Sequence, residues 1–63
     1  MPQVPLYKMP NAIYEVPVVI GNRNLKYLQI GYGITEEDQA ADAERRTKKD
    51  CPLGRVGKAR FWG

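Results

Sequence analysis

Large apolar side chains are unevenly placed and crowd the middle of this chain, and no feature restricts its fold more. After Ile34 no large apolar residue follows until Leu53. The crowded stretch contains Tyr14, Val16, Val18, Val19, Ile20, Leu25, Tyr27, Leu28, Ile30, Tyr32 and Ile34. A chain of 63 residues buries only about 60 % of the surface that it exposes when unfolded. Its one hydrophobic surface therefore has little chain to cover it, and such surfaces are usually buried by another molecule.

Covalent and metal cross-links are not available to stabilise so small a chain. Cys51 is the only cysteine and histidine is absent, which excludes an internal disulfide and a structural zinc site. Association with a partner is the remaining device that small domains use. We expect one domain at most, a small α+β fold with little independent core.

Residues 13–33 have the composition of a β-hairpin. Two β-branched and aromatic segments flank the turn sequence of residues 21–24, Gly-Asn-Arg-Asn, in which glycine and asparagine tolerate positive φ. Pro17 lacks an amide proton, which favours a sheet edge or a bulge at this position. Because an isolated hairpin is marginal in water, we expect its edge at Val16, Pro17 and Val18 to meet a partner.

Residues 35–50 are predicted to form one polar α-helix. Thr35 is a suitable N-cap with Asp38 three residues later. Acidic side chains open the segment and basic ones close it, the order that the helix dipole favours. Its apolar residues are alanines only, so the helix either projects into solvent or lies closely on another surface. Pro52 ends it.

The two ends of the chain are predicted to be extended. Residues 1–12 form a proline-rich arm, and residues 51–63 form a basic, glycine-bearing tail that ends in two aromatic residues. We expect the arm and the tail to lie along a partner. The predicted partner contacts are Leu6, Tyr7 and Met9 in the arm, Val16, Pro17 and Val18 in the hairpin, and Phe61 and Trp62 in the tail.

Positive charge is concentrated in the C-terminal third. The net charge is only +3, yet seven basic residues and a single acid, Asp50, lie between Arg45 and Arg60. Such a segment suits phosphates or an acidic protein surface. The basic residues are Arg45, Arg46, Lys48, Lys49, Arg55, Lys58 and Arg60.

Catalysis is not expected from this composition. Histidine and serine are absent, which removes the commonest general base and a common nucleophile. Cys51 remains as a nucleophile, but no base is placed by a recognisable spacing. The acids of residues 36–44 are explained by the start of a helix. We therefore expect no enzyme activity, cofactor, metal or small-molecule substrate.

These features predict a protein that acts by binding. The first expectation is a structural or accessory subunit of a larger macromolecular assembly, such as a virion decoration protein, held by its extended arms through obligate protein–protein interaction. The alternative is a small nucleic-acid-associated protein of ribosomal type that binds phosphates through its basic C-terminal third. No apolar stretch reaches the length of a bilayer span, and the N-terminus lacks the features of a signal peptide. This predicts a location inside the cell or within a virus particle.

Overall fold

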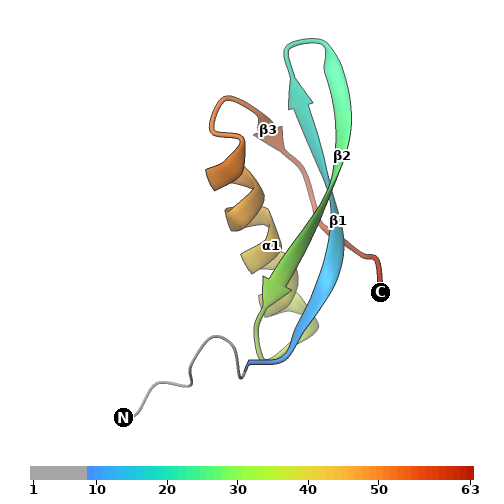
Figure 1. Ribbon diagram of the computed structural model, residues 1–63, viewed down its shortest axis with the longest axis vertical. Helices are drawn as coiled ribbons and strands as arrows, with labels where there is room; N and C mark the ends of the chain where they lie inside the picture. Colours follow the sequence, from blue (N-terminus) through green and yellow to red (C-terminus); the bar gives the residue numbers. More distant parts are fainter. Residues whose placement is uncertain (1–8) are drawn as a thin grey trace.

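A computed structural model shows a four-stranded antiparallel sheet with one helix against it, and it describes residues 9–63 (Figure 1). The elements are β1 (Asn11–Ile20), β2 (Arg23–Tyr32), α1 (Glu36–Asp50), β3 (Arg55–Val56) and β4 (Arg60–Phe61). The predicted small α+β fold is confirmed. Leu6 and Tyr7, predicted partner contacts, lie outside the described residues.

β1 and β2 form the predicted hairpin in one unbroken register. Asn11 is opposite Tyr32 at the open end, and Ile20 is opposite Arg23 at the turn. The turn consists of Gly21 and Asn22, and Gly21 has φ +62°. A residue with a side chain is strained in that conformation, so the glycine makes this tight turn possible.

The C-terminal tail folds back and adds strands to the free side of β1. Val56 of β3 is opposite Val18, and Phe61 of β4 is opposite Tyr14. The strand order is β2-β1-β3, with β4 also paired to β1. The expectation that Pro17 marks a sheet edge open to a partner is therefore wrong, because β1 is paired along both sides.

Pro17 is accommodated in an interruption of that second pairing. The amide of Gly57 donates to the carbonyl oxygen of Pro17 over 2.8 Å. Since the carbonyl and amide positions of a strand residue point to the same side, the missing amide of Pro17 also faces the tail. It falls between β3 and β4, where no ladder bond is needed. A Cβ at residue 57 would press on the proline ring, so glycine lets the chain pass.

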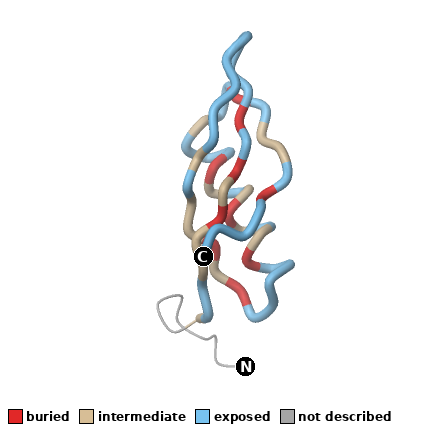
Figure 2. Tube along the Cα trace, turned by 90° about the vertical axis from the view of Figure 1, so that its right-hand side faces the viewer, coloured by how far each residue is buried: buried red, intermediate tan, exposed pale blue. Residues whose placement is uncertain are grey.

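The core lies between β1 and α1 and contains few large side chains. Tyr14, Val16 and Val18 are buried on the strand, and Ala43 and Thr47 are buried on the helix. Figure 2 shows the buried segments as short stretches in the middle of the molecule, interrupted by exposed ones. The predicted role of Val16 and Val18 as partner contacts is also wrong, because both are 0 % exposed within their own chain.

A buried polar chain joins the two layers. The Tyr14 hydroxyl donates to Gln39 Oε1 over 3.0 Å, and Gln39 Nε2 donates to the carbonyl oxygen of Gly33 over 3.1 Å. Burial raises the pKa of Tyr14, and the charge of Glu36 raises it further. The tyrosine thus stays a neutral donor, and the buried amide is satisfied at both ends.

α1 begins and ends where the residue types predict. The Thr35 side chain accepts from the Asp38 amide over 3.1 Å, which confirms the predicted N-cap. The helix stops at Asp50, two residues before Pro52. At this end the Lys48 ammonium donates to the carbonyl oxygens of Pro52 and Gly54.

Small residues bring α1 into close contact with β2. A Cβ at Gly31 would overlap the carbonyl oxygen of Gln39 and lie 3.1 Å from the Cβ of Ala43. Of the two expectations for this helix, projection into solvent or close packing on a surface, the structure shows the second. The surface is the sheet of the same chain.

Gly31→Ala should destabilise the fold by about 2–3 kcal/mol, because the added methyl group pushes the helix off the sheet. Asn24→Ala, on the exposed part of the same strand, should change the free energy of unfolding by less than about 0.5 kcal/mol. Urea unfolding followed by circular dichroism measures both. Equal effects of the two substitutions would contradict the close contact.

Candidate binding surface

The two faces of the sheet differ in what covers them. α1 lies over the face that carries Tyr14, Val16 and Val18, and no element of residues 9–63 lies over the other, which we name the outer face (Figure 1). Alternation along each strand and the pairing register identify its members. They are Ile13, Glu15, Pro17, Val19, Asn24, Lys26, Leu28, Ile30, Arg55, Arg60 and Trp62.

Three cations from three different strands lie on the outer face. Lys26 of β2 is opposite Pro17, Arg55 of β3 is opposite Val19, and Arg60 of β4 is opposite Glu15. The Lys26 side chain is 72 % exposed, and its ammonium lies 3.8 Å from the Glu15 carboxylate. With three cations and one acid, this face carries a net positive charge.

Trp62 lies at one end of the outer face. Its amide donates to the carbonyl oxygen of Ile13 over 2.9 Å, which continues the β4 register and holds the backbone in place. The side chain is 60 % exposed. Phe61 points to the opposite face, where its ring packs edge-on against Tyr14 with centroids 5.7 Å apart. The two aromatic residues of the tail, both predicted partner contacts, are therefore on different sides of the sheet.

The basic run of the C-terminal third does not form one surface. Arg45 and Arg46 both bind the Asp42 carboxylate within α1, at 3.1 and 2.7 Å. Lys48 bonds to carbonyl oxygens beyond the helix end. The pairing register places Arg55 and Arg60 on the outer face.

Lys26 joins them from β2, and sequence reasoning missed it. It is a single cation in an apolar strand, far along the chain from the others, and only the pairing register brings it near them. Lys49 and Lys58 are exposed, on α1 and between β3 and β4 respectively.

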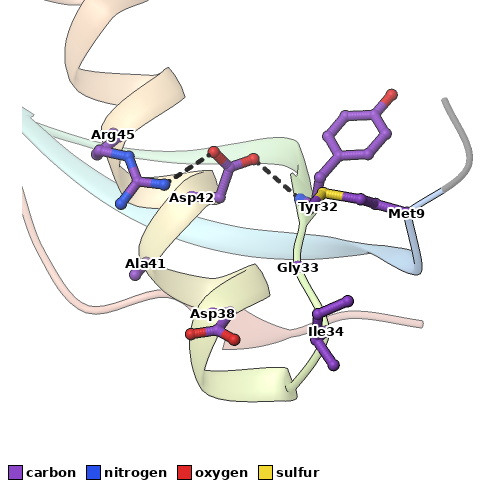
Figure 3. Close-up of a pocket in the computed structure, with 8 residues that line it drawn as sticks. All are labelled: Met9, Tyr32, Gly33, Ile34, Asp38, Ala41, Asp42 and Arg45. Atoms are coloured by element: carbon purple, nitrogen blue, oxygen red, sulfur yellow. Dashed lines mark hydrogen bonds and ion pairs between the residues drawn. The ribbon is translucent and has the colours of Figure 1, made fainter. Parts of the chain in front are cut away.

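A hollow of about 350 Å³ lies at the open end of the hairpin, between the start of α1 and the end of β2 (Figure 3). Met9, a predicted partner contact, lines it together with Tyr32, Gly33, Ile34, Asp38, Ala41, Asp42 and Arg45. Figure 3 shows the Asp42 carboxylate between Arg45 and the backbone of Tyr32. The carboxylate accepts from the Tyr32 amide over 2.9 Å, and the Arg46 guanidinium lies 4.7 Å from the Tyr32 ring centroid. The Asp42 carboxylate, which lines the hollow, therefore connects α1 to the end of β2.

Hydrogen bonds and a neighbouring charge outweigh burial in setting the pKa of Asp42. Burial alone would raise its pKa, but hydrogen bonds from Arg46, the Tyr32 amide and Arg45, together with the charge of Arg46, hold the pKa below its usual value. The carboxylate is thus ionised and fully engaged within the chain.

No group of three or more potential metal ligands occurs within residues 9–63. The helix of this region is too short and too polar to cross a bilayer. Comparison with protein families, with curated proteins and with solved structures found no match.

Asp42→Asn should lower the free energy of unfolding by about 1–3 kcal/mol at pH 7, because a charged acceptor of three hydrogen bonds is lost. The lowered pKa means that this contribution is present above the unfolded-state value of about 3.9 and is lost as pH falls through the lower folded-state value. The difference from the parent protein should therefore shrink below about pH 4. Thermal unfolding between neutral and acid pH measures it.

Glu37→Gln is the matched control, since this carboxylate is exposed in the first turn of α1. It should cost less than about 1 kcal/mol. A deficit of Asp42→Asn that persists unchanged at acid pH would show that the carboxylate charge is not the cause.

Proposed function

We propose that this chain is a non-catalytic nucleic-acid-binding module that contacts phosphates through the outer face of its sheet. One observation carries the proposal: Lys26, Arg55 and Arg60, from three different strands, gather on the face that α1 leaves bare. In complexes with nucleic acids, lysine and arginine side chains commonly bind the phosphate groups of the backbone.

The spacing of the cations suits a polymer of charge. Arg55 and Arg60 face β1 residues four positions apart, Val19 and Glu15, which is about 13 Å along a strand. Each strand of a duplex carries a charge about every 3.4 Å along the axis, so the two guanidinium groups reach phosphates several nucleotides apart. Lys26 faces Pro17, between these two positions.

Trp62 adds a second type of contact. It follows Arg60 by two residues and is on the same face, more than half exposed. An exposed indole beside cations stacks on bases, a contact worth about 1–3 kcal/mol per base. Phosphate pairing and stacking are largely independent of sequence, so we expect general rather than sequence-specific binding.

The structure also changes which expectation has most support. The accessory-subunit expectation relied on an extended arm at each end of the chain and on an open edge at Pro17, and residues 1–8 of the N-terminal arm lie outside the described residues. Here the tail supplies β3 and β4 of the chain's own sheet, and β1 is paired on both sides. The cations of the tail, by contrast, remain exposed.

Binding should be strong at low salt and should weaken steeply as salt is added. Three phosphate contacts give a slope of log affinity against log salt of about −2 to −3. Trp62 is the only tryptophan, so quenching of its fluorescence reports contact with unlabelled single-stranded and duplex DNA and RNA. Anisotropy of labelled oligonucleotides gives the affinity. A slope near zero would contradict phosphate binding.

Arg60→Ala should reduce the salt slope by about one, as expected for one lost phosphate contact. Lys49→Ala is the matched control, because it removes the same charge from the exposed side of α1. It should leave the slope unchanged. Equal losses from both variants would indicate that net charge, rather than the outer face, is responsible.

A second candidate, the accessory subunit of a larger protein assembly, is favoured by apolar side chains on the same face. Leu28 is 53 % exposed and Val19 is 37 % exposed, and the apolar core of a protein interface would bury both. For this function, Leu28→Asp should prevent assembly while Lys26→Ala permits it. Size-exclusion chromatography of the native complex in high salt distinguishes the candidates, since a protein interface survives conditions that release nucleic acid.

A further inference from the structure

The free edge of β2 is the longest unpaired backbone segment of the sheet. β2 has ten residues and pairs with β1 along one side only, within the described residues 9–63. The opposite side of the sheet is formed by β3 and β4, which have two residues each and are separated at Gly57. Short, interrupted strands resist further pairing, whereas a long regular strand invites it.

Half of this edge is blocked by the chain's own side chains. Alternate amides of β2 point away from β1. Of these, the Tyr32 amide donates to Asp42 over 2.9 Å, and the Ile30 amide donates to the side chain of Gln29 over 3.2 Å. The amides of Asn24, Lys26 and Leu28 have no acceptor among residues 9–63. The open half thus lies towards the hairpin turn.

Apolar side chains flank this open half on both faces of the sheet. Leu25 is 42 % exposed on the face that carries α1, and Leu28 is 53 % exposed on the outer face. β2 contains no proline, and its register with β1 has no bulge. Lys26 is the one charged residue in residues 24–28. The edge therefore combines free backbone groups with apolar surface.

We propose that a second copy of this chain occupies the edge, with its β2 antiparallel to the first and a two-fold axis at Leu25. In this register Asn24 and Lys26 of each copy exchange backbone hydrogen bonds with Lys26 and Asn24 of the other. Leu25 faces Leu25 of the second copy at a position without ladder bonds, where side chains come closest.

Neighbouring registers are less favourable. An axis at Lys26 would place two ammonium groups directly opposite each other, which is destabilising. An axis at Tyr27 would pair Asn24 with Ile30, whose amide is already bonded to the side chain of Gln29. The axis at Leu25 uses only open backbone groups and opposes no like charges.

Charge complementarity favours a second copy over an unrelated strand. The Leu25 axis places Arg23 of one copy opposite Tyr27 of the other, on the face where α1 ends. α1 ends at Asp50, near this part of β2, and the charges of Cys51 and Asp50 raise the pKa of Tyr27. Asp50 also binds Gln29 over 2.9 Å. Arg23 therefore approaches an acid and the negative end of a helix dipole, and the symmetry makes two such pairs.

The proposed interface between the two β2 strands is small, so the dimer should be weak. Stable interfaces bury about 1,200–2,000 Å² in total, and a strand pair of roughly five residues per copy falls below this range. We expect a reversible dimer with a dissociation constant on the order of 100 µM. Sedimentation equilibrium from about 10 µM to about 1 mM spans that transition.

Lys26→Pro should weaken the dimer by at least about tenfold, because it removes an amide at the interface. That amide points away from β1, so the hairpin keeps its own bonds. Lys26→Ala is the matched control, and it should leave the dimer intact or tighten it because a gatekeeping charge is gone. Circular dichroism verifies that both variants fold.

A charge reversal tests the pairing even where the proline variant does not fold. Arg23→Glu should weaken the dimer about tenfold or more by placing two acids together, and adding Asp50→Lys should restore it. Failure of the second change to restore association would overturn the assigned contact.

Disulfide trapping tests the register. In a Cys51→Ala background, Leu25→Cys should form a cross-linked dimer, because paired positions at the axis bring Cβ atoms within about 5.5 Å. Ile34→Cys is the control, at a residue that is 66 % exposed and distant from the edge. A monomer at every concentration, or equal cross-linking of the two variants, would overturn the proposal. All these measurements omit nucleic acid, so their failure is distinct from failure of the proposed function.

Discussion

The contact between α1 and β2 at Gly31 is the interaction on which the rest of the structure depends. The helix has no large apolar side chain, so it can bury area only by lying very close to the sheet. Gly31 permits this approach, and Ala43 packs against it. The hydrogen bonds from Tyr14 through Gln39 to Gly33 then hold the layers together. A core of this kind is small, in keeping with the low burial expected for so short a chain.

One helix can cover only one face of a sheet, and this determines which side chains of the sheet stay exposed. Val16 and Val18 are buried on the face that α1 covers, whereas Lys26, Arg55 and Arg60 lie on the outer face. The cations on α1 are used differently, since Arg45 and Arg46 hold Asp42. The composition of the outer face is therefore a consequence of how the core is made.

The tail contributes both to stability and to that surface. Its path along β1 depends on the missing amide of Pro17 and on the small size of Gly57, which together allow the chain to leave and rejoin the sheet. This detour places Arg55 and Arg60 at separate positions on the same face. The same route buries Ala59 and packs Phe61 against Tyr14.

Much of the fold was predictable because its signals are local. The β-branched run, the turn at Gly21 and the cap at Thr35 each act within a few residues, and each formed as predicted. The strands β3 and β4 were not predictable, because they have two residues each and exist only through pairing with β1. For the same reason the role of Pro17 was misjudged: whether a strand is at an edge depends on a segment some forty residues away.

By itself, the sequence determined the kind of protein this is: a small α+β chain without internal cross-links, with a polar helix and a basic C-terminal third. Only the tertiary structure determined which cations share a face. Arg45 to Arg60 are continuous in sequence, but helix and strand lie in different layers and so divide them. Lys26 joins Arg55 and Arg60 because pairing to opposite sides of β1 brings residues distant in the chain onto one face.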